Sequence, residues 1–413
     1  MPRTLADRVT VTQEGRGFGK ARHDESRPDG GWNDRPLRAV HVTSVHQADD
    51  ARILYREAAE LKALGLDVAV IGPYERDGVV EGVCIRAIRR PASRLWRILS
   101  APWRALAAAR RVPSDVLHFH DPELLPAALV AKAVLCRAVV FDAHEDVSLF
   151  ALKDWLPRGV RKVVSAAMGV FHRFCARRLD GVVVPTRLLH EKYLGLAPRV
   201  VTFVNYPPPA ALRMRDEAWQ PVAERRNEVV HLGTLRIARL EFLIEVGRRF
   251  LDRHPDWSMT LLGMHPAALE HFERNVRGPI RERLHGRGKM SHPEVIAYLC
   301  RARVGVNYHP LDSEQVRVAI PAKVFEYLAC GLPVVTTEVP LLKELLADCP
   351  AVRWSEDSAE SFADALAETA ARADLAQVAD QGRRFSDERF RCEAEARRLL
   401  AMYRDIFGRA PDG

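Results

Sequence analysis

Residues 319–338 read AIPAKVFEYLACGLPVVTTE, and this stretch indicates a short helix followed by a buried strand. We expect the helix to begin beside Pro321 and to end at Gly331, because glycine readily adopts the left-handed conformation that follows a helix end. Pro333 then prevents the helix from continuing. The run PVVTT has no polar alternation, which is typical of a parallel strand covered on both faces. The stretch therefore predicts one helix-to-strand step of an α/β fold.

Two charged residues of the predicted helix share one face. Lys323 and Glu326 are three positions apart, so their side chains are neighbours on the helix surface. A cation near a helix N-terminus can bind a diphosphate, and a carboxylate one turn along can accept hydrogen bonds from both hydroxyls of a ribose. The pattern therefore indicates a nucleotide site. An exposed ion pair between the two side chains is the alternative interpretation.

Several segments resemble known glycosyltransferases. The pattern P-x-K-x-F-E-Y-x-A-x-G-x-P-V-V is similar to the donor-site helix of GT-B glycosyltransferases, specifically the large retaining family 4. HFHDPELLPAAL (118–129), VVFDAHED (139–146) and DDARILYREAAELKALGLDVAVIGP (49–73) resemble one bacterial branch of that family. The matches run from about residue 38 to about residue 400. The resemblance implies an α/β fold of the GT-B type, with two Rossmann-like domains whose parallel sheets face a central cleft.

Length and composition indicate a soluble globular chain. Its 413 residues exceed what one core usually serves, so we expect two domains. The chain is 47% hydrophobic and 28% charged, and it has no apolar run of about 18 residues, so no transmembrane helix is predicted. Seven cysteines are scattered without a C-x-x-C pair, which is typical of reduced thiols in a cytoplasmic protein and gives no metal signature. The net charge of +8 favours an anionic partner.

Strand-like and helix-like segments alternate along both halves of the chain, which predicts a parallel, doubly wound sheet in each. The N-terminal leader lacks an apolar core segment and is not a secretory signal. Three consecutive prolines at 207–209 indicate a linker. The predicted parts are a disordered leader at 1–36, an N-terminal Rossmann-like acceptor domain at 37–205, a linker at 206–222, a C-terminal Rossmann-like nucleotide-sugar domain at 223–385 and a C-terminal helix at 386–413. The resemblance implies that this helix crosses back onto the N-terminal domain.

The segment HLGTLRIARLEFLIEVGRRF (231–250) corresponds to the glycine loop of the resembled family, usually G-R-L-x-x-x-K-G, which holds the diphosphate. Gly233 is present, Arg239 stands where the lysine is expected, and Thr234 replaces the arginine. We expect Arg236 to supply the missing charge. With Lys323, these arginines would neutralise the departing nucleoside diphosphate, so that no metal is required.

The family's two-glutamate motif, E-x7-E, is incomplete in this chain. The position eight residues before Glu326 is Val318, and Glu314 lies farther away in a polar loop. The branch with P-x-K-x-F-E-Y often lacks the first glutamate. Activity is therefore still expected, while the contacts to the donor sugar are left open.

The resemblance also implies residues on the acceptor side. His144 follows a predicted strand and inherits the position of a histidine that touches the transferred sugar; capping of the next helix is the alternative. Asp121 and Glu123 lie in a predicted cleft loop near the acceptor or donor sugar.

The loop after the first strand offers three more acceptor-side candidates, and these are Asp49, Asp50 and Arg52. They are expected to bind the acceptor or a phosphate. Capping of the following helix by Asp49 or Asp50 is the alternative.

The sequence HFHD at 118–121 also permits a metal site. His118 and His120 alternate on one strand and so point to one face. With Asp121, Glu123 and His144 nearby in the sheet, they could serve a metal-dependent hydrolase. Hydrolases of that type need further His and Asp residues at later strand ends, and the sequence contains no such series.

Two helices of the N-terminal half are basic. Residues 94–111 contain five arginines, two tryptophans and no acid, and residues 158–178 are also cationic. Such helices can lie on an anionic membrane surface, and Pro102 is expected to break or bend the first one. An ordinary packed helix with a solvated charged face is the alternative. Nucleic acid is not expected as a partner, because no recognition module is present.

Together these observations predict a metal-independent hexosyltransferase, and the resemblance to family 4 implies that it retains the anomeric configuration. It would move a sugar from an NDP-sugar, its co-substrate, to a glycan or lipid-linked acceptor in surface polysaccharide or glycolipid biosynthesis. No other cofactor is predicted. We expect a cytoplasmic protein with peripheral association at the inner face of the membrane. An NDP-sugar epimerase of the same fold and an inactive sugar-nucleotide-binding subunit are the remaining alternatives.

Overall fold

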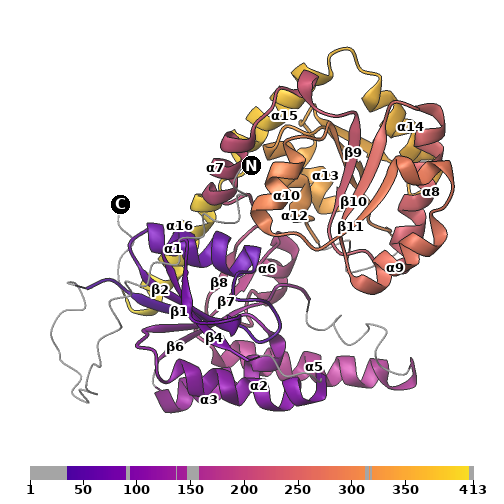
Figure 1. The fold of residues 1–413 in the computed structure, drawn as a ribbon. Coiled ribbons are helices and arrows are strands. Elements are labelled where there is room, and N and C mark those ends of the chain that lie inside the picture. The colour runs from indigo at the N-terminus through magenta and orange to yellow at the C-terminus, as the bar shows by residue number, and fades with distance from the viewer. Residues whose placement is uncertain are drawn as a thin grey trace. The chain divides into compact units, whose positions relative to one another are not determined.

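The computed structural model describes residues 35–89, 94–135, 137–146, 158–311, 316 and 319–408. The chain divides into two compact units. The N-terminal unit comprises the chain up to Val184, His190–Phe203 and the residues from Ala396 onward, and the C-terminal unit comprises Pro185–Leu189 and Val204–Glu395. Figure 1 shows both units. The predicted disordered leader lies outside the described residues, except for its last two positions.

The N-terminal unit is built on an eight-stranded sheet with the order β3-β4-β2-β1-β5-β6-β7-β8. Its strands are β1 (Arg38–Val42), β2 (Asp67–Pro73), β3 (Gly78–Val80), β4 (Val83–Ile88), β5 (Val116–Phe119), β6 (Ala138–Asp142), β7 (Gly181–Val184) and β8 (Val200–Thr202). All neighbouring strands pair in parallel except β3 and β4, which pair antiparallel at the edge. Strands β5, β6 and β7 are buried at every residue, as expected for a sheet covered on both faces.

Helices cover both faces of this sheet. They are the π-helix η3 (Ala51–Ala58), α1 (Ala59–Ala63), α2 (Arg94–Ala109), the 3-10 turn η4 (Pro122–Leu124), α3 (Leu125–Leu135), α5 (Arg158–Arg178), α6 (Arg187–Tyr193), whose first residues belong to the other unit, and α16 (Cys392–Ile406). In Figure 1, α2, α3 and α5 pack side by side on one face, and α1 lies with α16 on the opposite face. Helix α2 runs through Pro102, so the predicted break at that proline is not found.

The C-terminal unit has a six-stranded, fully parallel sheet with the order β11-β10-β9-β12-β13-β14. Its strands are β9 (Glu228–Leu232), β10 (Ser258–Met264), β11 (Leu284–Gly288), β12 (Val304–Asn307), β13 (Val334–Thr337) and β14 (Val352–Ser355). Its helices are α7 (Pro209–Ala218), η5 (Val222–Glu224), α8 (Ile237–Arg253), α9 (Pro266–Asn275), η6 (Pro279–Glu282), α10 (His292–Leu299), α12 (Ala322–Ala329), α13 (Pro340–Leu346), α14 (Ala359–Ala370) and α15 (Leu375–Arg389). Both units are therefore parallel α/β domains, which confirms the predicted fold class.

The stretch 319–338 forms the predicted helix and strand. Helix α12 ends where Gly331 takes a φ of +67°, and the backbone N–H of Leu332 donates to the carbonyl of Tyr327. A side chain at Gly331 would be strained by that φ and would begin 2.7 Å from the ring of Trp219. Strand β13 follows and is buried throughout. The glycine is required here both by the backbone conformation and by the packing.

The segment predicted as a linker, residues 206–222, is partly helical. Residues 206–222 contain helix α7, which packs against α10 in the C-terminal unit. The proline run does not prevent this helix, because proline is tolerated in the first helical turn, where its missing N–H has no partner within the helix. Pro208 is the N-cap residue of α7, and Pro209 is its first helical residue.

Within the described part of the chain, no helix combines the length and the apolar character needed to cross a membrane. The six described cysteines form no disulfide bond with one another.

Candidate functional site

The C-terminal unit has a pocket at the carboxyl ends of three adjacent strands. Its volume is about 630 Å³, within the range of sites that bind small molecules. The residues after β9, β10 and β11 line it, and they include Leu232, Gly233, Thr234, Met264, His265, Lys289 and Met290. In open α/β sheets, ligands bind outside the carboxyl ends of the strands, so this is the expected place for a nucleotide.

Two glycines let the backbone pass closely at the mouth of this pocket. Gly233 has a φ of +122° and Gly263 a φ of +89°, so both positions disfavour any side chain. A Cβ atom on Gly233 would lie 3.4 Å from Nζ of Lys323. The structure therefore brings the predicted glycine loop and the predicted cation of α12 together.

Lys323 is the centre of a cationic group. Its Nζ lies 3.1 Å from Nε2 of His231, at the end of β9. Desolvation and then the nearby Arg239 lower the pKa of Lys323 to about 7. Burial, followed by the charge of Lys323, holds the pKa of His231 well below its usual range, so this imidazole is neutral and can accept a hydrogen bond from the ammonium.

The start of α8 adds further positive charge. Arg236 is the N-cap residue of α8 and is exposed, while Arg239 is half-buried in the first turn. Burial and then Arg236 lower the pKa of Arg239, so the guanidinium groups are close enough to repel. Thr234 is exposed at the pocket rim. A helix N-terminus with two arginines attracts an anion such as a phosphate.

Glu326 lies one turn further along α12 and is only 6% exposed. Its Oε1 is 3.4 Å from Nε2 of His292. The alternative of an exposed ion pair with Lys323 therefore does not hold, because the carboxylate is buried and faces α10. The predictions for Glu314 and Val318 lie outside the described residues.

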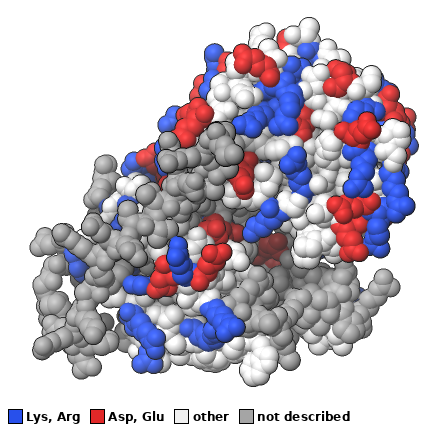
Figure 2. All heavy atoms as spheres, viewed as in Figure 1, with Lys and Arg blue, Asp and Glu red and all other residues white. Residues whose placement is uncertain are grey.

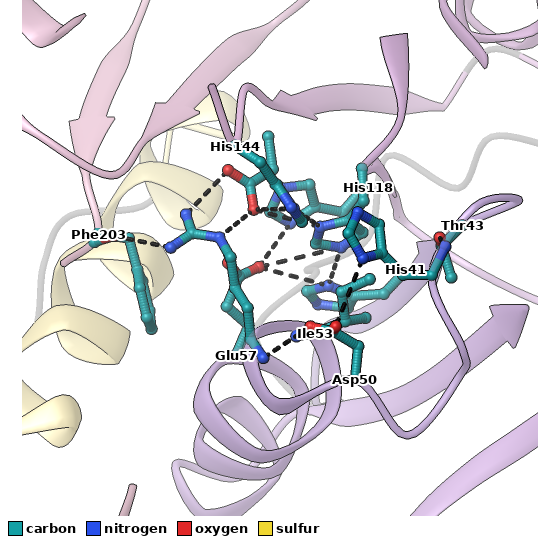
Figure 3. Close-up of polar contacts among 12 residues, drawn as sticks. His41, Thr43, Asp50, Ile53, Glu57, His118, His144 and Phe203 are labelled. Carbon is teal, nitrogen blue, oxygen red and sulfur yellow. Dashed lines mark hydrogen bonds and ion pairs between the residues drawn. The ribbon is translucent and has the colours of Figure 1, made fainter. Parts of the chain in front are cut away.

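On the N-terminal unit, His144 follows β6 and is held by buried groups (Figure 3). Its Nε2 lies 3.0 Å from Oδ2 of Asp142 and 3.1 Å from Nδ1 of His120. The His144 side chain remains 18% exposed. A carboxylate therefore orients the ring while one part of it can still meet a ligand.

Asp142 is itself fixed by a buried arginine. Arg52 donates from Nε to Oδ2 at 2.7 Å and from Nη2 to Oδ1 at 2.8 Å, and its Nη1 donates to the carbonyl of Phe203. Burial opposes ionisation of Asp142, but the charge of Arg52 outweighs it and holds the pKa of Asp142 well below its usual range. The guanidinium of Arg52, predicted to bind the acceptor, is thus engaged within the unit.

The carboxylates of Asp121 and Glu123 accept hydrogen bonds from residues of the loop after β1. Asp121 accepts hydrogen bonds from Oγ1 of Thr43 at 2.8 Å and from the backbone N–H of Ser44 at 2.6 Å, and Glu123 accepts from Oγ of Ser44 at 2.9 Å. Asp121 thus faces the loop after β1. The hydrolase hypothesis required Asp121, His118 and His120 to bind one metal ion together. Among the described residues, Asp121 belongs to neither group of side chains that could share an ion.

Asp50 caps η3, which confirms the capping alternative. Its side chain accepts from the backbone N–H groups of Arg52 and Ile53. His46 approaches its other oxygen, with Nδ1 3.4 Å from Oδ2, and burial of His46 is outweighed by Asp50, so the pKa of His46 is raised to about 9. Asp49 is exposed beside it.

Several histidines and one glutamate that lie near the candidate sites were not predicted from the sequence. His41 on β1 and Glu57 on η3 are fully buried, and His41 pairs in register with His118 on β5. In the C-terminal unit, His231 and His292 contact the two predicted nucleotide residues. The available signal was a histidine within an otherwise apolar strand, in VHV for His41 and in VHL for His231.

Figure 2 shows acidic and basic side chains interspersed over the viewed face of the C-terminal unit. The net positive charge does not form one continuous basic surface on that face.

Comparisons by sequence find one glycosyltransferase profile on each half of the chain. The family described as "Glycosyl transferase 4-like domain" matches residues 51–207, and the family described as "Glycosyl transferase-like" matches residues 247–401. A search among curated proteins finds no match.

Comparisons by structure find GT-B enzymes over nearly the whole chain. Sucrose-phosphate synthase from Thermosynechococcus elongatus has a TM-score of 0.64 at 15% identity, covering 90% of this chain and 99% of that chain. The HepE protein of Anabaena, solved with UDP and glucose, has a TM-score of 0.62 at 12% identity, covering 88% and 98%. The catalytic domain of starch synthase IV from Arabidopsis thaliana, bound to ADP and acarbose, has a TM-score of 0.60 at 12% identity, covering 91% and 100%.

These structural likenesses establish the fold, and the two sequence profiles, one on each unit, establish the type of reaction. We conclude that the protein is a glycosyltransferase with the GT-B fold, as its sequence predicted.

Proposed function

We propose that the protein is a retaining hexosyltransferase of the family 4 type. It takes the sugar from a nucleoside-diphosphate sugar and needs no metal for the transfer. The observation that carries this proposal is the position of Lys323 beside Gly233. Its Nζ lies 3.4 Å from where a side chain on Gly233 would begin, and Gly233 lines a pocket of about 630 Å³. Because Gly233 has no side chain, nothing at that position covers the ammonium of Lys323, which supports contact between this ammonium and a phosphate group.

The cationic residues of the donor site would stabilise the leaving group. Lys323, Arg239 and Arg236 would neutralise the charge that develops on the diphosphate as the bond to the sugar breaks. A nucleoside diphosphate brings negative charge close to Lys323 and so favours the ammonium form of this side chain over the neutral amine. This arrangement supplies by side chains the charge that a divalent cation supplies in other transferases.

Glu326 would recognise the ribose. A carboxylate can accept from two neighbouring hydroxyls at once, and the burial of Glu326 beside His292 fixes its position. HepE was solved with UDP and starch synthase IV with ADP, so we propose a UDP- or ADP-sugar as donor.

On the N-terminal unit, His144 would contact the transferred sugar. Its ring is oriented by Asp142 and keeps 18% of its side chain exposed. Retention follows from the family 4 resemblance, and the proposed mechanism is front-face attack by the acceptor assisted by the leaving phosphate.

We further propose a glycan or lipid-linked acceptor at an anionic membrane surface. Helices α2 and α5 expose large apolar side chains, namely Trp96, Leu99, Trp103, Val160, Val163, Val170, Phe171 and Phe174. Trp96 is 67% exposed and Val163 71% exposed, which a helix with a purely charged outer face would not show. Exposed basic residues, which are Lys162, Arg173, Arg177 and Arg178, accompany them on α5. Aromatic and basic side chains together are typical of interfacial helices.

A thermal-shift screen tests the donor assignment. UDP-, GDP- and ADP-glucose are added to the full chain, and a bound donor raises the melting temperature by mass action. Lys323→Ala should lose the shift, whereas Lys343→Ala, an exposed lysine paired with Glu338, should keep it. If no nucleotide shifts the wild-type protein, the donor site is refuted.

Product analysis then separates the alternatives. Incubation of the preferred NDP-sugar without acceptor would yield a new sugar nucleotide if the protein were an epimerase, and nothing at all if it only bound the nucleotide. Transfer to a lipid-linked acceptor, with the anomeric configuration of the product read by NMR, supports the proposal. An inverted anomer would refute retention.

A further inference from the structure

A closed group of four potential metal ligands lies inside the N-terminal unit (Figure 3). His41 comes from β1, His118 and His120 from β5 and the residue just after it, and Glu57 from η3. Their exposures are 0%, 0%, 1% and 0% in that order. None of them was proposed above to touch the donor or the acceptor.

The spacing of the ligand atoms suits a small cation. One oxygen of Glu57, Oε2, lies 3.6 Å from Nδ1 of His41, 3.8 Å from Nδ1 of His118 and 4.0 Å from Nε2 of His120. A tetrahedral zinc ion with ligand bonds of about 2.0–2.1 Å separates its ligands by roughly 3.3 Å. The four side chains therefore surround a point that such an ion could occupy after small side-chain rotations.

Several polar atoms of this group lack a hydrogen-bond partner among the described residues. They are Oε2 of Glu57, Nε2 of His41 and Nε2 of His118, whereas Oε1 of Glu57 lies 3.1 Å from Nε of Arg52. Buried polar atoms without partners are rare in folded proteins, because losing the hydrogen bonds to water is unfavourable. Oε2 of Glu57 faces three imidazoles and has no hydrogen-bond partner among the described residues, so it is placed as a metal ligand would be.

A carboxylate lies behind one of the three histidines, as is usual for histidines that bind a metal. Nδ1 of His120 lies 3.2 Å from Oδ2 of Asp142, which leaves Nε2 of His120 directed at Glu57. A carboxylate behind a metal-binding histidine fixes the tautomer and the ring orientation. Asp142 is in turn fixed by Arg52.

We propose that His41, Glu57, His118 and His120 hold a buried divalent transition-metal ion, with zinc as the expected occupant. Three imidazoles and one carboxylate form a ligand set that zinc accepts, whereas calcium and magnesium prefer oxygen ligands alone. Because all four side chains are closed to solvent, the ion is structural: it ties β1, β5 and η3 together beneath His144. It is separate from the donor site and takes no part in neutralising the diphosphate.

Two contacts must change when the ion binds. Nδ1 of His41 and Nε2 of His120 are 2.9 Å apart, and this separation must widen. Nδ1 of His118 also lies 2.6 Å from the hydroxyl of Tyr403, which must release it. Removing that hydroxyl with Tyr403→Phe should therefore leave the metal content unchanged or higher, although it deletes a buried hydrogen bond.

The metal content of the full chain tests the proposal without any activity assay. Protein expressed in zinc-supplemented medium and dialysed at neutral pH is analysed by inductively coupled plasma mass spectrometry, and we expect about one zinc per chain. Glu57→Gln and His41→Ala should each reduce it about tenfold or more. His190→Ala is the matched control, because His190 bonds Thr202 in the same unit, and it should keep the full content.

Cobalt provides a second readout that needs no variant. Wild-type protein unfolded with chelator and refolded with Co²⁺ should show the visible absorption bands of a tetrahedral cobalt site, and its melting temperature should exceed that of protein refolded without metal. Zinc below about a tenth of an equivalent, together with no cobalt spectrum, would overturn the proposal. Folded Glu57→Gln or His41→Ala protein that keeps the wild-type zinc content would also overturn it.

Discussion

Nucleotide binding should become weaker as the pH rises above 7, because the lysine of the donor site is then losing its proton. Burial and Arg239 lower the pKa of Lys323 to about 7 in the unliganded protein. About half of the Lys323 side chains are charged at pH 7, about one in eleven at pH 8 and about one in a hundred at pH 9. If the diphosphate binds the charged form, the Kd should rise about fivefold from pH 7 to pH 8 and about tenfold more to pH 9.

The stability of the unliganded protein should respond in the opposite direction. In the unfolded chain Lys323 titrates near its ordinary pKa of about 10.4. The unfolded state therefore binds more protons than the folded state between pH 7 and about pH 10, so the contribution of Lys323 to the free energy of unfolding rises with pH in that window. Below pH 7 the full penalty for burying the charge is present. As the pH increases, the affinity for the nucleotide therefore falls, while the contribution of Lys323 to the free energy of unfolding rises.

Isothermal titration calorimetry measures this linkage directly. UDP is titrated at pH 7, 8 and 9 in two buffers that differ in ionisation enthalpy, and the difference gives the number of protons taken up. The protein should take up about one half of a proton per bound UDP at pH 7 and about nine tenths of a proton at pH 8. The other groups facing Lys323 do not mimic this signal, since burial holds the pKa values of His231 and His309 below their usual range and Arg239 stays charged.

Lys323→Arg is the matched control, because arginine keeps its charge over the whole range. This variant should bind UDP with an affinity that no longer changes from pH 7 to pH 9. A wild-type Kd that is constant over the same range, with no proton uptake, would refute the reasoning that Lys323 must be charged to hold the diphosphate.

Three further predictions concern the donor site, the metal requirement and the membrane. Glu326→Ala and Lys323→Ala should each weaken NDP binding by about 1.5–3 kcal/mol, the usual loss for a charge-assisted hydrogen bond, with unchanged circular dichroism; calorimetry that finds wild-type affinity in both folded variants would contradict the donor assignment. Turnover should survive excess EDTA added to the assay, because side chains neutralise the leaving group and the proposed structural ion is closed to solvent; activity that EDTA abolishes at once and one added metal restores would favour metal-assisted transfer. The protein should sediment with anionic vesicles, not with neutral ones, and high salt should release it, since each basic residue near an anionic surface contributes about 1 kcal/mol; protein that stays in the supernatant with both vesicles at low salt would show that α2 and α5 are packing elements.

The elements that the sequence predicted well are those with a local cause. Gly331 and Pro333 end α12 and start the next strand because their backbone restrictions act on their own neighbours. The proline run at 207–209 has no such single local meaning, because proline permits the first turn of a helix as readily as it ends one. Only the packing of α7 on α10 decides between these two outcomes.

The candidate site was predictable only in part, because many of its partners are distant in sequence. Lys323 and Glu326 were found from their spacing, but His231, 92 residues away from Lys323, was not. Arg52 was expected to face a ligand, and its pairing with Asp142, 90 residues away, gave no local signal. Whether a charged residue near a strand end meets a ligand or a buried counter-ion depends on such long-range partners.

The orientation of His144 can be traced to the way η3 is wound. Asp50 caps this helix, and the π-helical turn that follows buries both Arg52 and Glu57 toward the sheet. Extra residues in a helical turn are frequent at functional sites, because they alter which side chains face inward. Arg52 keeps Asp142 ionised, and ionised Asp142 can accept a hydrogen bond from His144. A neutral residue at position 52 would remove the charge that holds the pKa of Asp142 low. Asp142 would then take up a proton more readily and would no longer accept a hydrogen bond from His144 as a carboxylate. The winding of η3 thus affects the orientation of His144, which follows strand β6.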